Sequence, residues 1–143
     1  MHMQSRTARP MDYGADPYVV NLESATKQNS FYRRTLWTGY HLQVTLMSIP
    51  PQGEIGLEVH ENDDQFLRIE EGCGMARMGS CRDNLSLQRT VSSGDAVLIP
   101  AGTWHNVVNT GSVPLKIYSI YAPPHHPKGT VHRTKGESDA GGV

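Results

Sequence analysis

The segment 94–109, GDAVLIPAGTWHNVVN, contains a histidine in a setting typical of a metal ligand. Its first glycine opens a turn, and residues 96–99 form a short apolar run that predicts a buried strand. A proline and a second glycine then reverse the chain. His105, Val107 and Asn109 alternate along the next predicted strand, so their side chains share one face. This arrangement directs one imidazole into the interior of a β-barrel, where metal binding is its usual role.

Further donor groups lie upstream in the segment 54–72, EIGLEVHENDDQFLRIEEG. Glu58 and His60 are two residues apart, so on a strand both side chains point to the same face. Gln65 begins a second apolar alternation after a turn rich in Asn and Asp, which places it on a neighbouring strand. The segment therefore offers a carboxylate, an imidazole and an amide oxygen at a shared position.

The two segments resemble the two signatures of the cupin superfamily. Segment 94–109 matches the second signature at every position: Gly, five residues, Pro, one, Gly, two, His, three, Asn. Segment 54–72 resembles the first, in which two histidines precede a glutamate, with Glu58 in place of the first histidine and Gln65 in place of the glutamate. The resemblance covers roughly residues 36–122 and implies an all-β fold, the cupin double-stranded β-helix, a small antiparallel jelly-roll barrel with a metal in its lumen.

The resemblance implies four metal ligands: Glu58, His60, Gln65 and His105. Oxygen donors favour Mn²⁺ or Fe²⁺, while imidazole also accepts Zn²⁺ or Ni²⁺. Two other registers would use Asn62 or Asp64, and Asp64 is disfavoured because it would turn Leu67 and Ile69 to the opposite face. A second interpretation makes both histidines ordinary core or surface residues. Two spaced motifs in the right order favour the metal site.

The remaining pattern predicts short strands without long amphipathic helices. Over 40–46, apolar residues alternate with His41, Gln43 and Thr45, which predicts a strand whose apolar side chains face the core and whose His41 is at the surface. Further strands are expected at 54–60, 65–71, 73–78, 85–91, 96–99, 104–109 and 114–121. The predicted organisation is a flexible segment at 1–16, a single cupin domain at 17–122 and a Pro/Gly-rich tail at 123–143.

Strand parity also predicts what surrounds the metal. Leu67, Ile69 and Val107 should line the lumen and make its walls apolar, which suits a small organic acid, a ketone or an aromatic ring. Tyr118 and Tyr121 lie on the last predicted strand, and one of them could face the metal.

Two groups of polar residues at the ends of the domain have competing interpretations. Arg33, Arg34 and Trp37 precede the first predicted barrel strand and could close one mouth of the barrel, but solvated arginines and a core tryptophan are favoured. The segment after 121 contains His125, His126 and His132. It could form a lid or a second metal site, although a solvated Pro-rich tail is favoured.

The amino-acid composition limits the classes of binding partner that we expect. The 143 residues have a formal net charge of −1 and no basic stripe, which argues against nucleic acid or an anionic membrane as the partner. We find no signal-peptide pattern and no apolar run of membrane-spanning length, and Cys73 and Cys81 are expected to be reduced thiols of a cytoplasmic protein. A homodimer formed through an arm strand at 17–22 is expected, because small cupins commonly pair their N-terminal strands.

The function expected from these features is a metalloenzyme acting on a small oxygen-bearing organic molecule. It would be a Lewis-acid isomerase or lyase, or a dioxygenase. The alternative is a non-catalytic binding or storage cupin whose metal is structural, and an inward general base near the metal would distinguish the two. The fold by itself decides neither, because cupins support many chemistries.

Overall fold

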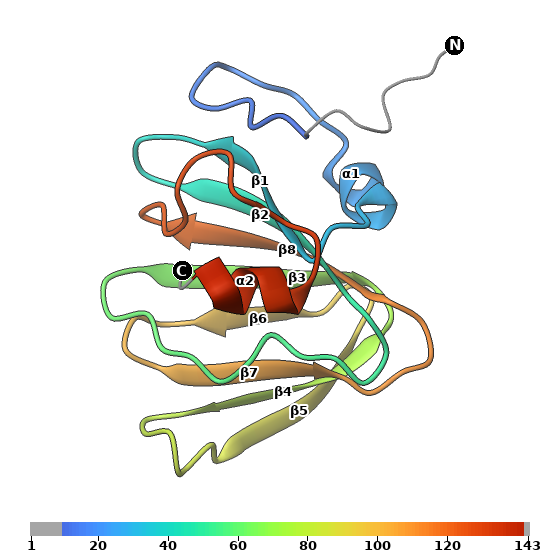
Figure 1. Cartoon of the computed structure of the whole chain (residues 1–143). Coiled ribbons are helices and arrows are strands. Elements are labelled where there is room, and N and C mark those ends of the chain that lie inside the picture. Colours follow the sequence, from blue (N-terminus) through green and yellow to red (C-terminus); the bar gives the residue numbers. More distant parts are fainter. Residues whose placement is uncertain (1–9, 142–143) are drawn as a thin grey trace.

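A computed structural model of the chain describes residues 10–141. Two antiparallel sheets face each other (Figure 1), one of six strands in the order β6-β3-β8-β2-β1-β9 and one of three in the order β5-β4-β7. The strands are β1 Arg33–Thr38, β2 Gln43–Ile49, β3 Asp64–Glu71, β4 Cys73–Gly79, β5 Leu87–Ser92, β6 Ala96–Ile99, β7 Trp104–Asn109, β8 Leu115–Ala122 and β9 Val131–His132. The predicted all-β jelly roll is confirmed.

The core lies between the two sheets and is built by residues two apart on each strand. Leu67 and Ile69 of β3 and Val107 of β7 are at most 1% exposed, as strand parity predicts. Asn109 continues the inner face of β7, where its amide donates to the carbonyl oxygens of Ile49 and Val113, at 2.9 Å each. Burying a polar amide at this depth is tolerated because its hydrogen bonds are made.

The predicted strands from 65 onward agree with the observed ones within two residues, but two upstream predictions are wrong. Residues 54–60 form no continuous strand and touch β7 only through the isolated bridges Glu54–Val108 and Glu58–His105. The face of β2 is also inverted: Gln43 and Thr45 are completely buried on the inner face, whereas Tyr40 is 86% exposed. Gln43 is tolerated on the inner face because its amide donates to the His126 carbonyl at 2.7 Å.

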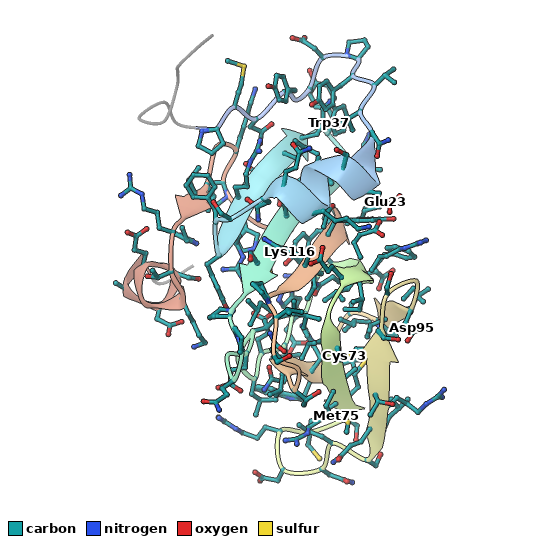
Figure 2. All side chains as sticks on the ribbon, turned by 90° about the vertical axis from the view of Figure 1, so that its right-hand side faces the viewer. Glu23, Trp37, Cys73, Met75, Asp95 and Lys116 are labelled. Atoms are coloured by element: carbon teal, nitrogen blue, oxygen red, sulfur yellow. The ribbon has the colours of Figure 1, made fainter. Side chains whose placement is uncertain are left out.

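Helix α1, Leu22–Gln28, explains why the opposite face of β2 is also apolar. Asn21 caps the helix by accepting the N–H of Ser24, and the helix packs on the outer face of β8, β3 and β2, where it covers Leu46. The expected arm strand at 17–22 is therefore replaced by an extended approach to this helix. Figure 2 shows α1 lying across the sheet, with Trp37 at the opposite end of the molecule from Cys73 and Met75.

Both terminal segments pack on β1 as far as the structure describes them. Residues 10–16 run beside it, and Asp12 accepts a 2.6 Å hydrogen bond from the Thr38 hydroxyl. Residues 1–9 of the expected flexible segment lie outside the described part. The segment 123–141 does not extend into solvent, which corrects the tail interpretation. It forms β9, paired with β1, and helix α2, Lys135–Gly141. No helix within 10–141 is long and apolar enough to span a membrane.

Candidate metal centre

The loop before β3 is held against β7 directly at the site. Glu58 and His105 exchange two backbone hydrogen bonds of 2.9 and 3.0 Å, so their side chains lie side by side. The second glycine of the turn before β7, Gly102, has a φ of 82° and donates its N–H to the His60 carbonyl at 2.8 Å. The positive φ explains the glycine. Backbone hydrogen bonds therefore hold the two sequence motifs against each other at the site.

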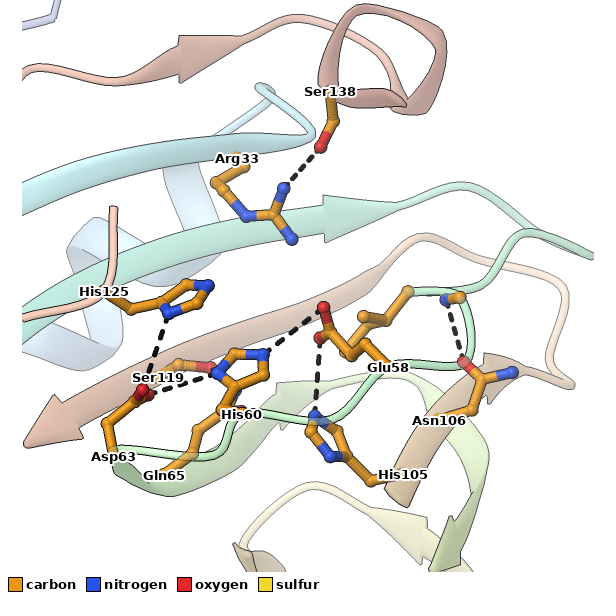
Figure 3. A network of polar contacts seen from close by, with 12 residues as sticks. Arg33, Glu58, His60, Asp63, Gln65, His105, Asn106, Ser119, His125 and Ser138 are labelled. Atoms are coloured by element: carbon orange, nitrogen blue, oxygen red, sulfur yellow. Dashed lines mark hydrogen bonds and ion pairs between the residues drawn. The ribbon is translucent and has the colours of Figure 1, made fainter. Parts of the chain in front are cut away.

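Three potential ligands converge around one carboxylate (Figure 3). One Glu58 oxygen lies 3.4 Å from His60 Nε2, and the other lies 3.4 Å from His105 Nε2. Donor atoms of the three residues all lie within 4.8 Å of one another. His60 and His105 are buried, at 6% and 1% exposure, while the Glu58 side chain is 31% exposed at the mouth. Both histidines therefore point inward.

Hydrogen bonds to the far nitrogens fix the orientation of both rings. His60 Nδ1 lies 3.1 Å from Asp63 Oδ2, and His105 Nδ1 lies 3.0 Å from the carbonyl oxygen of Thr103. Because both partners are acceptors, each Nδ1 carries the proton and each Nε2 presents a lone pair to the centre. This is the arrangement that carboxylates and carbonyls impose on metal-binding histidines.

Gln65, the fourth predicted ligand, is 4% exposed on β3. Its amide nitrogen donates to the Ser119 hydroxyl at 3.2 Å, which turns its oxygen the other way. Within the described residues, that oxygen and both histidine Nε2 atoms are buried without a hydrogen-bond partner. Buried polar atoms are rarely left unsatisfied unless an ion or water takes the place of the partner. In donor type and orientation, these residues fit a divalent cation.

The charges in the centre stabilise one another. Burial alone would raise the pKa of Glu58, but the adjacent His105 and His60 outweigh it and hold that pKa well below 4.5. Burial would lower the pKa of His60, yet the Glu58 and Asp63 carboxylates raise it above 6.5. The site therefore retains its carboxylate over the physiological range and attracts positive charge.

Sequence reasoning missed Asp63, and it favoured a solvated tail for His125, which it also offered as part of a lid or a second metal site. Asp63 is 8% exposed and binds His60, whereas its neighbour Asp64 is turned outward and accepts the N–H of Ala101 at 2.9 Å. His125 stacks on His60 with ring centroids 4.0 Å apart, and its Nδ1 lies 3.6 Å from Asp63 Oδ1. Asp63 lies in an irregular turn and His125 beyond the last barrel strand, so no periodic pattern indicates where either side chain points.

The end of β8 closes the other side of the centre. Tyr121 is the inward tyrosine, 1% exposed and stacked parallel to the His60 ring with centroids 5.6 Å apart. Tyr118 is on the outer face, stacked on Phe66. Burial raises the pKa of Tyr121 above 10.0, so its hydroxyl remains protonated at neutral pH. An aromatic wall and a phenol therefore adjoin the cluster.

The arginines before β2 also differ from expectation. Arg33 is not a solvated surface charge: it is 4% exposed, on the inner side of β1. Arg34, on the outer side, donates to the carbonyl oxygen of Met11 at 2.8 Å, and Trp37 donates its indole N–H to the carbonyl oxygen of Asp16 at 2.7 Å. Arg34 and Trp37 thus hold the N-terminal segment, while Arg33 belongs to the barrel interior.

Comparison with known proteins identifies the family that the sequence matches. The cupin domain family model matches residues 45–121. The chain is similar to the uncharacterized protein YrkC of Bacillus subtilis, 60% identical over 129 residues that make up 90% of this chain and 69% of YrkC. It is also similar to the uncharacterized protein L612 of Acanthamoeba polyphaga mimivirus, 38% identical over 87% of this chain and 77% of L612.

Solved structures agree. The crystal structure of BH2720 from Bacillus halodurans has a TM-score of 0.90 at 61% identity, with 91% of this chain and 98% of that chain covered. KdgF from Halomonas sp. has a TM-score of 0.57 at 19% identity, with 65% and 78% covered, and this likeness concerns the fold alone. With the motif residues meeting inside the barrel as described, the chain belongs to the cupin family and consists of a single small cupin domain.

Proposed function

We propose that the protein is a metalloenzyme that binds one divalent metal through Glu58, His60, Gln65 and His105 and acts on a small oxygen-bearing organic molecule. The observation that carries the proposal is a pair of buried Nε2 atoms without a hydrogen-bond partner, each 3.4 Å from an oxygen of the half-buried Glu58 carboxylate. The Oε1 atom of Gln65 is likewise buried without a partner. In a protein without a ligand for these atoms, their burial would only cost stability. The proposal includes a cytoplasmic homodimer, as the sequence leads us to expect.

The donor set favours Mn²⁺ or Fe²⁺, because one carboxylate and one amide oxygen accompany the two imidazoles, while Zn²⁺ or Ni²⁺ would also be accepted. When bound, the metal supplies a Lewis acid that polarises a carbonyl group, and as Fe²⁺ it also supplies a redox centre for chemistry with dioxygen. The single Glu58 carboxylate leaves a divalent ion with net positive charge, which favours an anionic or enolisable substrate.

The surrounding side chains favour catalysis over storage. His125 lies at the rim with its side chain 30% exposed, so a substrate entering the mouth can reach it. Burial lowers the pKa of His125 below 6.5, so the ring is neutral at pH 7 and can accept a proton. The buried phenol of Tyr121 can donate a hydrogen bond, and its ring centroid lies 5.6 Å from that of His60 and 5.4 Å from that of His125. A base and a donor beside the proposed metal suit isomerase or lyase chemistry.

The test is an activity panel run on protein of measured metal content. 1,2- and 1,3-dicarbonyls, flavonols and ketose sugars are incubated with Mn²⁺-loaded and Fe²⁺-loaded protein, with and without oxygen. Turnover that persists without oxygen would support a Lewis-acid isomerase or lyase, and oxygen consumption with Fe²⁺ would support a dioxygenase. His125→Gln should lose turnover while keeping its metal. If no compound is turned over, the protein is better described as a binding module.

A further inference from the structure

Arg33 is a buried cation inside the barrel. In the pairing of β1 with β2, Arg33 lies opposite Met47, which is 1% exposed in the core. Residues opposite each other on neighbouring strands point to the same face, so the Arg33 side chain enters the lumen. In Figure 3 its guanidinium lies between Ser138 of α2 and the Glu58, His60 cluster, on the same side of the sheet.

The guanidinium uses little of its binding capacity. It has five N–H donors, and the hydrogen bond observed for it runs from Nη1 to the Ser138 hydroxyl at 2.6 Å. Its Nε is buried and has no acceptor among residues 10–140. No carboxylate of that part of the chain lies within 4.0 Å of it. A buried charge normally has a counter-ion, because removing it from water is costly.

The groups nearest to Arg33 do not supply that counter-ion. Its guanidinium carbon lies 5.4 Å from the centre of the Tyr32 ring, which is neutral at physiological pH because burial raises the pKa of Tyr32 to about 12. His126 is buried beside it and cannot provide a negative charge. Figure 3 shows Glu58 on the lumen side of Arg33, and both of its oxygens are already directed at His60 and His105.

The wall between Arg33 and the proposed metal is polar. Strands β1, β2 and β8 direct buried polar side chains into this part of the lumen: Thr35, Gln43, Thr45, Ser119 and Tyr121. This departs from the apolar lining expected from the sequence, which holds only for the deeper part around Leu67, Ile69 and Val107. A polar wall with a fixed positive charge suits a ligand with an anionic end.

We propose that Arg33 binds a carboxylate group of a small molecule whose other oxygen atoms bind the divalent metal that Glu58, His60, Gln65 and His105 would hold. The inference rests on the proposed function and narrows it to carboxylic acids. The planar guanidinium fork matches a carboxylate with two parallel hydrogen bonds, and Nε together with one terminal nitrogen forms such a fork. Ser138 holds the other terminal nitrogen and thereby orients the free edge towards the lumen.

Binding of matched charged and neutral probes tests the proposal. Pyruvate, malonate and succinate are titrated calorimetrically against the Mn²⁺-loaded full chain, each beside its neutral amide. The wild type should prefer the acid over the amide for at least one pair. Arg33→Met should lose acid binding by roughly 10- to 100-fold while amide binding is unchanged, since a charged hydrogen-bonded pair is removed. Arg33→Lys should recover part of the loss, because it restores the charge without the fork.

Two control variants separate ligand binding from folding. Arg34→Met removes the neighbouring charge on the outer face and should leave the preference for acids intact. Ser138→Ala removes the contact with α2 and should weaken acid binding less than Arg33→Met does, because the guanidinium and its charge remain. An equal loss in Ser138→Ala and Arg33→Met would show that Arg33 only secures α2, and would overturn the proposal.

Metal content, measured on every sample, distinguishes a failure of the proposed metal centre from a failure of the proposed role of Arg33. A wild type that binds Mn²⁺ but prefers no acid over its amide would overturn the role of Arg33 and leave the metal centre standing. A wild type that binds no metal, yet binds acids in an Arg33-dependent way, would contradict the metal centre and support the anion site.

Discussion

Replacing His126 should change how the stability of the protein depends on pH. The His126 side chain is 6% exposed, and neither ring nitrogen has a hydrogen-bond partner within the described residues. Burial, followed by the positive charge of Arg33, lowers the pKa of His126 from 6.5 to about 2. The folded protein therefore keeps this ring neutral at pH values where the unfolded chain protonates it.

The sign and size of the pH effect on the free energy of unfolding follow from proton linkage. Between the two pKa values the unfolded state binds one more proton than the folded state at this residue, so stability falls as the pH falls below 6.5. A pH of about 5 lies about 1.5 units below the pKa of this imidazole in the unfolded chain. The free energy of unfolding is therefore lower by about 2 kcal/mol than at about pH 8. This loss hardly depends on the folded pKa, provided that it stays well below 5.

Urea unfolding of metal-free protein at about pH 8 and about pH 5 measures the effect. His126→Asn lacks the titrating group, so the stability difference between the wild type and this variant should shift by about 2 kcal/mol in favour of the variant on acidification. His41→Asn, at an exposed position, is the control and should stay parallel to the wild type. A wild type to His126→Asn difference that does not change with pH would refute the assignment of His126 as a buried neutral residue.

Other predictions concern the centre and the assembly. Gln65→Glu should bind Mn²⁺ more tightly in a calorimetric titration, because it adds a negative charge, and an unchanged affinity would show that Gln65 is not a ligand. Asp63→Ala should weaken metal binding about 10- to 100-fold by releasing the His60 ring, and Asp64→Ala, on the outer side, should not. Light scattering should give about twice the 15.8 kDa of one chain, and a monomer at micromolar concentration would contradict the expected dimer.

The inward direction of the candidate metal ligands was predictable because the spacing of the motifs also determines their geometry. The turn before β7 and the alternation along β7 fix where His105 points, and the register of β3 fixes Gln65 in the same way. His60 was placed correctly although 54–60 forms no continuous strand. The bridge at Glu58 and the bond from Gly102 to the His60 carbonyl hold the loop in a strand-like position there.

The features that were not predictable depend on contacts between distant parts of the chain. The face of β2 could not be assigned, because α1 covers its outer side and makes Leu46 as buried as the inner residues. His126 and Arg33 are buried because the segment after β8 returns across β2 and β1, and Gln43 of β2 accepts the backbone N–H groups of His125 and His126. A proline-rich composition predicts exposure, and here those long-range hydrogen bonds override it.

Metal stoichiometry tests whether Glu58, His60, Gln65 and His105 bind one divalent metal. Protein stripped with a chelator is titrated with Mn²⁺ by calorimetry, and its metal content after dialysis is measured by elemental analysis, for the wild type, His105→Ala and His41→Ala. We expect one equivalent of metal in the wild type and in His41→Ala, and loss of most of the metal in His105→Ala. Full occupancy in His105→Ala, or no binding of Mn²⁺, Fe²⁺, Zn²⁺ or Ni²⁺ by the wild type, would contradict this metal site.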